Sequence, residues 1–586
     1  MGTATASPSA KPGSTTSTGR SAWRAAAPWR RSGAPDPRMT EEPTPRELLD
    51  RAVAAHRAGR LDEAAALYRA VLTQAPEEPN ALTNLGTVAL QQGRLDEGVA
   101  LIEASLKIRP DQSNAINNRA NALMTLGRLD EALAGFTRAI ELDAGNVEAH
   151  ANQAGVLRDL GRLSEAQAAY ERAIALQPTF LDALNGLANT LEALGQAEAA
   201  AGIYDRALEL APQAWELHFN RGNALRATNR PAEAVAAYDR AAALNPASAE
   251  VWANRAAPLQ ALKRLDEAMA SCERALALDP DHANANWNKA LLLLLAGDEA
   301  AGWRQYEWRW RQPSFVGTVP PEGPRWLGET PLDGKRLLIV CEQGFGDTIQ
   351  MLRYARVAAE RADEVLAIVQ PPLSELAASV AGIDRVLTGG EPITYDAWIP
   401  MMSLPHAFGA PPYGTPYMAA PADKRQAWAD RLGPRTRPRV GLVWSGRANH
   451  GNDANRSLSL AALAPLLAAD ADFISLQTEY RDADRAVLAA EPRIRDVSGE
   501  LASFSDTAGL IEALDLVISV DTSVAHLAGA LGRPLLILLP FSPDFRWRAE
   551  GPSSAWYPSA RLLRQPAFGA WGPVIAQALE AVRDLR

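Results

Sequence analysis

A short sequence that returns at a fixed spacing constrains this chain more than any other feature. The string Gly-Arg-Leu-Asp-Glu-Ala begins at Gly59, and each later variant begins 34 residues after the one before it. The variants begin at Gly93, Gly127, Gly161, Gly195, Asn229, Lys263 and Gly297. A period of this length indicates copies of one supersecondary unit, each of which buries its apolar face against its neighbours.

Other positions keep the same period and show what each unit contains. Small residues recur at Ala52, Gly86, Ala120, Ala154, Ala188, Gly222, Ala256 and Ala290, and proline closes most units. Apolar residues at helical spacing predict two amphipathic helices per unit, which the small residues allow to approach closely. The pattern closely resembles the tetratricopeptide repeat, with seven units from about residue 45 to 282 and a divergent eighth. This resemblance implies an all-α solenoid.

A row of asparagines lies two residues before the small positions, on the first helix of each unit. Its members are Asn84, Asn118, Asn152, Asn220, Asn254 and Asn288, with Gly186 as the gap. An asparagine amide offers both a donor and an acceptor, so a row of them can bind an extended peptide backbone. The row resembles the asparagine ladder of the nucleocytoplasmic O-GlcNAc transferases, which implies a peptide-binding concave surface. The alternative is that asparagine is simply common at this phase of the repeat.

The eighth unit contains Trp303, Trp308 and Trp310 among arginines. Alternating arginine and tryptophan can stack on nucleic-acid bases. Three tryptophans so close together are more typical of a cap that attaches the repeats to the next domain. We therefore predict a structural cap at the end of the repeats.

The period stops after Pro313, where short apolar segments begin to alternate with helices. Strands are predicted at 335–341, 365–369, 396–400, 439–444, 473–476, 516–520 and 535–539. Helices are predicted at 348–362, 372–380, 460–469, 481–490, 524–531 and 571–583, and a stretch at 411–438 rich in proline and glycine interrupts the pattern. Such alternation is typical of parallel α/β sheets, whose ligands bind beyond the carboxyl ends of the strands. Two such series predict two lobes with a cleft between them.

Three motifs follow these strands. They are Gly344-Phe345-Gly346-Asp347-Thr348, then 441–446 with Asn452-Asp453 and Arg456-Ser457 downstream, and the segment 521–534 (DTSVAHLAGALGRP). Together they resemble the heptosyltransferase-like enzymes of glycosyltransferase family 9. The resemblance spans residues 335–586, and it implies a two-lobed GT-B fold built from two Rossmann-like lobes.

The resemblance also implies roles for single residues. Asp347 takes the place of the family's general base, although aspartate is equally a favoured helix cap. A nucleotide-sugar donor needs amides and positive groups around its diphosphate. The expected donor-binding residues are Gly344, Gly346, Ser445, Gly446, Arg447, Arg456, Asp521, Thr522, Ser523 and His526. Arg456 stands where the heptosyltransferases often have lysine, which leaves the sugar and nucleotide open. No cofactor and no metal are expected.

Charge and composition exclude several classes of protein. The net charge of −10 is the sum of +5 over residues 1–38, −10 over 39–312 and −5 over 313–586, and the two acidic folded halves argue against nucleic acid as a partner. Two cysteines, Cys272 and Cys341, exclude a disulfide scaffold, and both are expected in the core. No apolar run is long enough for a membrane span. A cytoplasmic location is expected.

The expected organisation is a disordered basic tail at 1–38, repeats at 39–312, a linker at 313–334, and lobes at 335–420 and 421–586. The tail also weakly resembles an organelle transit peptide, or precedes a true start at Met39. The predicted function is an inverting, metal-independent transfer of a sugar to Ser or Thr of a polypeptide that the repeats capture. This arrangement is similar to O-GlcNAc transferases and to bacterial flagellin glycosyltransferases. The alternatives are a scaffold with an inactive transferase half and a transferase of polysaccharide assembly.

Overall fold

The computed structural model describes residues 43–315, 321–390, 392–410, 414, 416–447 and 451–585. The tail expected over 1–38 and part of the expected linker, 316–320, lie outside the described residues. The chain divides into two compact units, one that ends at Arg128 and one that begins at Leu129.

The described part of the first unit consists of helical repeats. Its helices are α1 (Pro45–Arg57), α2 (Leu61–Gln74), α3 (Pro79–Gln91), α4 (Leu95–Ile108) and α5 (Ser113–Thr125). Their apolar faces form a cluster that includes Leu48, Ala52, Tyr68 and Leu85. A glycine is needed at position 86, where two helices touch, because a Cβ there would lie 2.7 Å from Ile102 Cγ1.

The second unit begins with further repeats of the same kind. Its repeat helices are α6 (Leu129–Leu142), α7 (Val147–Asp159), α8 (Leu163–Leu176), α9 (Leu181–Ala193), α10 (Ala197–Leu210), α11 (Trp215–Ala227), α12 (Pro231–Leu244), α13 (Ala249–Ala261), α14 (Leu265–Leu278), α15 (Ala283–Ala296) and α16 (Glu299–Tyr306). A small residue is again needed where two helices touch, here against an aromatic ring, since a Cβ on Gly222 would lie 2.7 Å from Tyr238 Cε1. The predicted tetratricopeptide repeats are thereby confirmed.

A four-stranded parallel sheet follows the repeats. Its strands are β1 (Arg336–Val340), β2 (Glu364–Ile368), β3 (Arg385–Leu387) and β4 (Ala397–Pro400), in the order β3-β2-β1-β4. The helices around it are α17 (Phe345–Met351), α18 (Ala355–Ala359), α19 (Ser374–Ala377) and α20 (Leu404–Phe408). Trp326, from the segment before β1, is buried, and its amide donates to the carbonyl of Trp398 at 2.8 Å.

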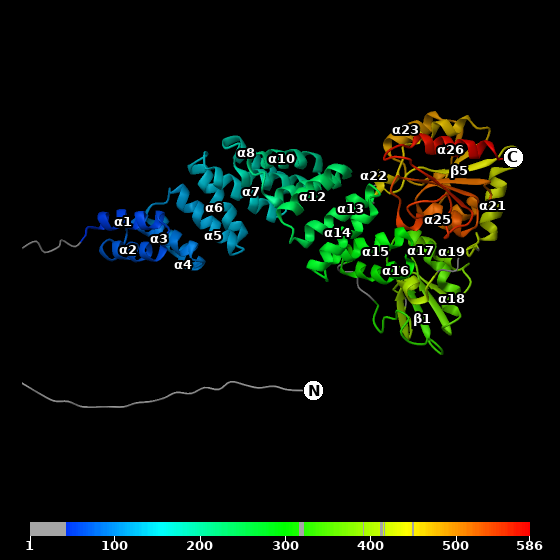
Figure 1. Cartoon of the computed structure of the whole chain (residues 1–586), viewed down its shortest axis with the longest axis horizontal. Helices are drawn as coiled ribbons and strands as arrows, with labels where there is room; N and C mark the ends of the chain where they lie inside the picture. Colours follow the sequence, from blue (N-terminus) through cyan, green and yellow to red (C-terminus); the bar gives the residue numbers. More distant parts are fainter. Residues whose placement is uncertain are drawn as a thin grey trace, which may run out of the picture. The chain divides into compact units, whose positions relative to one another are not determined.

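A six-stranded parallel sheet forms the second lobe. Its strands are β5 (Arg439–Val443), β6 (Asp472–Ser475), β7 (Ile494–Asp496), β8 (Leu516–Val520), β9 (Leu535–Leu539) and β10 (Ala560–Arg564), in the order β10-β9-β8-β5-β6-β7. Its helices are α21 (Ala422–Leu432), α22 (Asp453–Arg456), α23 (Asp482–Ala490), α24 (Phe504–Glu512), α25 (Ser523–Ala530) and α26 (Gly572–Arg583). Figure 1 shows α25 and α26 on opposite sides of the sheet that contains β5. Two parallel sheets in separate lobes confirm the predicted GT-B architecture.

Several predicted elements differ from the structure. The helix expected at 348–362 is broken into α17, a 3-10 turn (Leu352–Tyr354) and α18. The helix expected at 460–469 is a 3-10 helix (Leu460–Ala468) that contains Pro465. The interrupting stretch at 411–438 holds α21, and β3, β7, β10 and α24 were not predicted. These strands are short or partly exposed, so their hydrophobic pattern is weak. Cys272 is buried as expected, but Cys341 is only half-buried because it lies just after β1.

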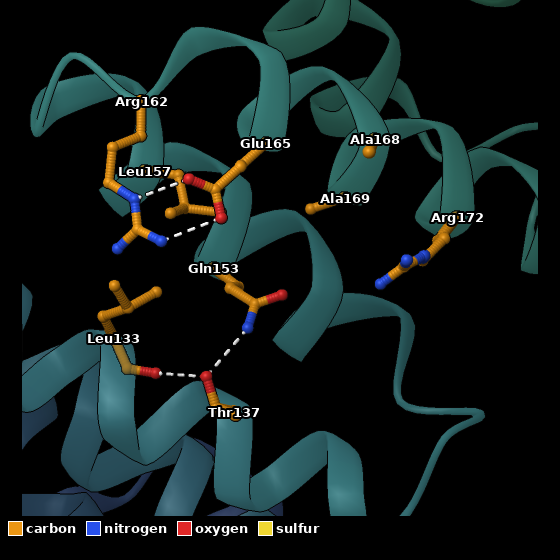
Figure 2. A pocket seen from close by; sticks show the side chains of 9 residues that line it. All are labelled: Leu133, Thr137, Gln153, Leu157, Arg162, Glu165, Ala168, Ala169 and Arg172. Atoms are coloured by element: carbon orange, nitrogen blue, oxygen red, sulfur yellow. Dashed lines mark hydrogen bonds and ion pairs between the residues drawn. The ribbon is translucent and has the colours of Figure 1, made fainter.

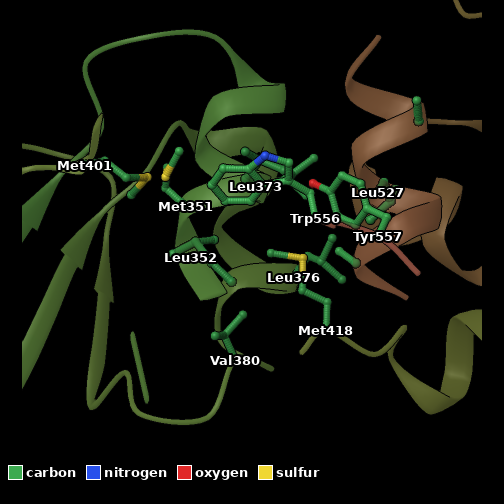
Figure 3. Close-up of a cluster of buried hydrophobic side chains, with 14 of the residues drawn as sticks. Met351, Leu352, Leu373, Leu376, Val380, Met401, Met418, Leu527, Trp556 and Tyr557 are labelled. Carbon is green, nitrogen blue, oxygen red and sulfur yellow. The ribbon is translucent and has the colours of Figure 1, made fainter. Parts of the chain in front are cut away.

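An apolar cluster joins the two lobes. Figure 3 shows Met351 and Leu352 of the first lobe facing Leu527, Trp556 and Tyr557 of the second. Arg353 is buried in the same contact, and its Nη1 donates to the carbonyl of Trp556 at 2.9 Å. The lobes therefore meet through a packed interface beside the loops that follow their strands.

Candidate active site

The glycine-rich loop of the first lobe meets the start of α25 in the second lobe. The closest approach is at Gly346, where a Cβ would lie 2.8 Å from His526 Cδ2 and 3.6 Å from Ser523 Cα. No larger residue fits there without movement of His526, whose ring is stacked on Trp547 at 5.3 Å. The first and third motifs, which are far apart in the sequence, therefore lie side by side.

Asp347 is both a helix cap and an ion-pair partner. One carboxylate oxygen accepts from the amide of Gly344 at 3.0 Å, which satisfies the backbone donor at the start of α17. The other oxygen accepts from Nη2 of Arg546. The cap and site interpretations of Asp347 are thus compatible, because each uses a different oxygen.

Arg546 is the central cation of this site, and it was not predicted. It lies in a 3-10 helix, η8 (Phe545–Trp547), and also donates to Asp544 at 2.7 Å and to Gln350 at 2.8 Å. Its side chain is 10% exposed. Burial alone would lower the pKa of Arg546, but Asp544 and Asp347 raise that pKa above its usual value. Because η8 follows β9, the rule about carboxyl ends of strands could have located this residue.

Asp521 and His526 lie close together at the start of α25. Burial and the neighbouring Asp544 carboxylate raise the pKa of Asp521 to about 6. Burial and nearby arginines hold the pKa of His526 well below its usual range, so the imidazole is neutral at pH 7. One ring nitrogen lies 3.8 Å from Asp521 Oδ1, and the other shares a hydrogen bond of 2.9 Å with the hydroxyl of Tyr557.

Arg456, from the second motif, contacts the third motif. Its Nη1 donates to the carbonyl of Asp521 at 2.8 Å, and its guanidinium fills the space beside Gly446. Its Nε is buried and has no hydrogen-bond partner among the described residues. The amide of Gly446 donates to Ser457 Oγ at 3.0 Å. This arrangement leaves Arg456 with a donor available to a ligand.

The remaining predicted residues occupy the same edge of the second sheet. Ser445 is buried, and Gln477 Nε2 donates to its hydroxyl at 3.1 Å, so this side chain supports the loop. Thr522 occupies the N-cap position of α25, but its hydroxyl bonds to the Ser519 hydroxyl at 3.0 Å instead of capping the helix. Arg447 is exposed and lies 5.4 Å above the ring of Phe345. Ser445 and Thr522 therefore shape the loops, and Arg447 faces the first lobe.

The end of the repeats packs on both loops of the site. Trp303 and Tyr306 lie against Phe545, at 5.7 and 5.9 Å between ring centroids. Arg309, which is fully buried, donates to Glu342 at 2.9 Å, just before the glycine-rich loop. These contacts confirm that the tryptophan-rich segment is a structural cap.

The asparagine row is partly engaged within the repeats. In the first unit, Asn118 donates to Thr87 at 3.3 Å. In the second unit, Asn254 donates to Asn223 at 3.3 Å, and Asn288 is buried and donates to the carbonyl of Ala253 at 3.0 Å. The side chains of Asn84, Asn152 and Asn220 are half-buried.

A hollow of about 280 Å³ lies among α6, α7 and α8, as Figure 2 shows. It is lined by Leu133, Thr137, Gln153, Leu157, Arg162, Glu165, Ala168, Ala169 and Arg172. Arg162 and Glu165 form two hydrogen bonds of 2.8 Å on its wall. None of the predicted site residues lines this hollow.

Comparison with known families finds a match within each half of the chain. A tetratricopeptide-repeat profile matches residues 49–113, 117–179, 156–214, 185–249 and 219–281. The profile of glycosyltransferase family 9 (heptosyltransferase) matches residues 473–565, a segment that contains Asp521, His526 and Arg546. The chain therefore carries tetratricopeptide repeats followed by a glycosyltransferase family 9 domain.

Protein FlbA of Caulobacter vibrioides is 28% identical over 333 residues, which are 50% of this chain and 54% of that protein. The chain thus spans about half the length of this curated relative. Among solved structures, YrrB, described as a tetratricopeptide-repeat protein with an unusual peptide-binding site, is 23% identical and covers 31% of this chain and 95% of its own, with a TM-score of 0.30. A tetratricopeptide-repeat protein of Parabacteroides merdae is 19% identical, with coverages of 42% and 98% and a TM-score of 0.32.

Within the described ranges, no helix combines the length and the apolar character that crossing a bilayer requires.

Proposed function

We propose that this chain transfers a sugar from a nucleotide-sugar donor to a Ser or Thr hydroxyl of a polypeptide bound by the repeats. The observation that carries the proposal is the meeting of Asp347 with Arg546 and the start of α25 across the two lobes. A potential base and a cationic edge are thereby adjacent, as glycosyl transfer from a diphosphate requires.

The donor diphosphate binds at the start of α25 in this proposal. The helix presents a positive dipole end, and Arg456 and Arg546 add two guanidinium groups at the same edge. These groups neutralise the departing diphosphate, so the reaction proceeds without a metal. Asp521 holds a hydroxyl of the donor or acceptor, and neutral His526 lines the site.

Asp347 serves as the general base. It takes the proton from the acceptor hydroxyl while the oxygen bonds to the anomeric carbon. The bond from that carbon to the diphosphate oxygen breaks, and its electron pair leaves with the nucleoside diphosphate. Attack opposite the leaving group inverts the configuration of the anomeric carbon.

The repeats supply the polypeptide acceptor. The proposed contacts are the amides of Asn84 and Asn118 in the first unit and of Asn152, Asn220, Asn254 and Asn288 in the second. Asn118, Asn254 and Asn288 already donate to Thr87, Asn223 and Ala253 within their own units. Support comes from the cap, because Trp303 and Tyr306 attach the last repeat directly to the loop that carries Arg546. A polypeptide on the repeats would therefore be tethered beside the transferase.

The test begins with a thermal-shift screen of nucleotide sugars, since a bound ligand raises the apparent stability. Transfer to polypeptide is then measured by mass spectrometry with the donor that binds. Asp347→Ala should reduce transfer by roughly 10²–10⁴-fold, the usual contribution of a general base, and should not weaken donor binding. Asp430→Asn, an exposed residue of α21, is the control. Unchanged transfer by Asp347→Ala would refute the assignment, and a wild-type chain that binds no nucleotide sugar would favour the scaffold.

A further inference from the structure

The ion pair between Asp347 and Arg546 joins the two lobes across the site. Asp347 belongs to the lobe of β1, and Arg546 belongs to the lobe of β9. The backbone of Gly346 lies directly over Ser523 and His526 at the first turn of α25. The first lobe therefore covers the start of α25, and its Asp347 carboxylate lies on Arg546 of the second lobe.

Arg546 belongs to the same sheet edge as the start of α25. Strands β8 and β9 are parallel neighbours, paired from Val517 with Leu535 to Val520 with Leu538. Their carboxyl ends consequently adjoin, so the loop with Arg546 lies beside the loop with Asp521 and Thr522. This is the edge at which parallel α/β sheets bind their anionic ligands.

Two buried donors near these residues lack acceptors. Arg456 Nε and Gln350 Nε2 are buried and have no hydrogen-bond partner within the described part of the chain. Arg456 donates through Nη1 to the Asp521 carbonyl, and Gln350 accepts from Arg546, so both side chains belong to this cluster. Unmatched donors of this kind are costly when buried, and they indicate a ligand that is rich in acceptor oxygens.

We propose that Arg546 is a ligand of the donor diphosphate, and that the Asp347 carboxylate competes with the diphosphate for Arg546. Donor binding then displaces Asp347 from the guanidinium and frees the carboxylate for the acceptor hydroxyl. The inference rests on the proposed function and adds an order of events, in which the donor binds before the base is free.

Calorimetric titration tests this competition. ADP, GDP and UDP are titrated into the wild-type chain, and the tightest binder is titrated into the variants. Asp347→Asn keeps an acceptor for the amide of Gly344 but removes the charge that competes for Arg546. It should bind the nucleoside diphosphate about tenfold more tightly, which corresponds to one lost ion pair of about 1.4 kcal/mol. Arg546→Gln should bind about tenfold or more weakly.

The double variant makes the test specific. If Asp347 acts by occupying Arg546, Asp347→Asn should give no gain of affinity in the Arg546→Gln background. Glu360→Gln and Arg356→Gln are the matched charge controls, because they remove one exposed charge of each sign from α18 or its end, and neither should change affinity. Should Arg546→Gln not fold, Asp347→Asn alone still decides, because it retains Arg546.

The outcomes separate this inference from the proposed function. Unchanged or weaker binding by Asp347→Asn, or an equal gain in both backgrounds, overturns the inference while the transferase assignment stands. If neither the wild-type chain nor Asp347→Asn binds any of the three nucleotides, both the inference and the proposed donor site fail.

Discussion

Glycine serves opposite needs in the repeats and in the candidate active site. Gly161, in a repeat turn, has φ +75°, and a Cβ there would meet nothing within 4 Å. Asn229 and Lys263 take equivalent turns at φ 58° and 57°, so the repeats tolerate a side chain at this position. Gly346 does not have a positive φ but has no space, because His526 lies 2.8 Å from where its Cβ would be. A positive φ favours glycine at position 161, whereas lack of space for a Cβ favours glycine at position 346.

The same difference appears in the ion pairs. In the repeats, Arg221 bonds to Asp205 at 2.5 Å, and the two residues are 16 positions apart. At the site, Asp347 and Arg546 are 199 positions apart. Repeat contacts therefore recur at short range and tolerate substitution, whereas the site depends on single contacts between distant segments.

The largest effect is expected at the buried junction between the cap and the glycine-rich loop. Arg309 has a fully buried side chain, and its partner Glu342 is 3% exposed. Arg309→Met leaves the Glu342 carboxylate buried without its cation, which typically costs about 3–5 kcal/mol. We expect a lower transition temperature in calorimetric scans, together with reduced transfer because the loop of Asp347 loses its support.

Arg311 provides the matched control, two positions further along the same 3-10 helix, η1 (Glu307–Arg311). Its side chain is 60% exposed and pairs with Asp281, which is 80% exposed, so Arg311→Met should cost at most about 1 kcal/mol. A double change, Arg309→Met with Glu342→Leu, should recover most of the stability, since no buried charge then lacks a partner. Equal effects of the Arg309 and Arg311 variants would remove the contrast between distant and local contacts.

The Asp521 carboxylate should lower the stability of the folded chain by an amount that depends on pH. Its pKa in the folded chain is raised to about 6, above about 3.9 in an unfolded chain. With respect to Asp521, the free energy of unfolding is therefore highest below about pH 4, where the carboxyl is protonated. It falls as the pH rises through about 6, where that carboxyl ionises. Asp521→Asn should be more stable than the wild type at pH 7.5 by up to about 3 kcal/mol, and should match it near pH 4.

Calorimetric scans at both pH values check the prediction for Asp521, with exposed Asp430→Asn as the control. Transfer by Asp521→Asn should fall although its stability rises, because the carboxylate belongs to the site. A stability gain that is the same at both pH values would contradict the raised pKa as its cause.

The two kinds of glycine give a smaller, directly comparable effect. Gly346→Ala places a methyl group against His526 and should cost about 1–3 kcal/mol through overpacking, with a clear loss of transfer. Gly161→Asn keeps a residue that tolerates positive φ and should cost less than about 1 kcal/mol, with unchanged transfer. Thermal unfolding and transfer rates measure both variants. Transfer reduced equally in both would show that the repeats and the site are not separable in this way.

This contrast also explains what the sequence could predict. The 34-residue period predicted the turns, the small positions and the end of the repeats, because the same contact recurs in each successive unit. The loops after β1, β5 and β8 were found because their motifs are rich in glycine and follow strong apolar runs. The position of Arg546 after β9 could have placed it at this sheet edge, but nothing in the local sequence indicates that it meets Gln350. Their pairing depends on how two lobes pack, which no local pattern encodes.

The smallest effect is expected within the asparagine row, where two members should respond differently. Asn220 is half-buried, and Asn220→Ala should weaken binding of a polypeptide acceptor by about 0.5–1.5 kcal/mol without changing stability, as loss of one hydrogen bond predicts. Asn288 is 8% exposed and donates to the carbonyl of Ala253, so Asn288→Ala should instead lower stability by about 1 kcal/mol. The KM for acceptor and the transition temperature distinguish the two results. If Asn220→Ala lowers stability and leaves the KM unchanged, its amide supports the repeats as Asn288 does, and the row is a packing feature of the fold and does not bind a polypeptide.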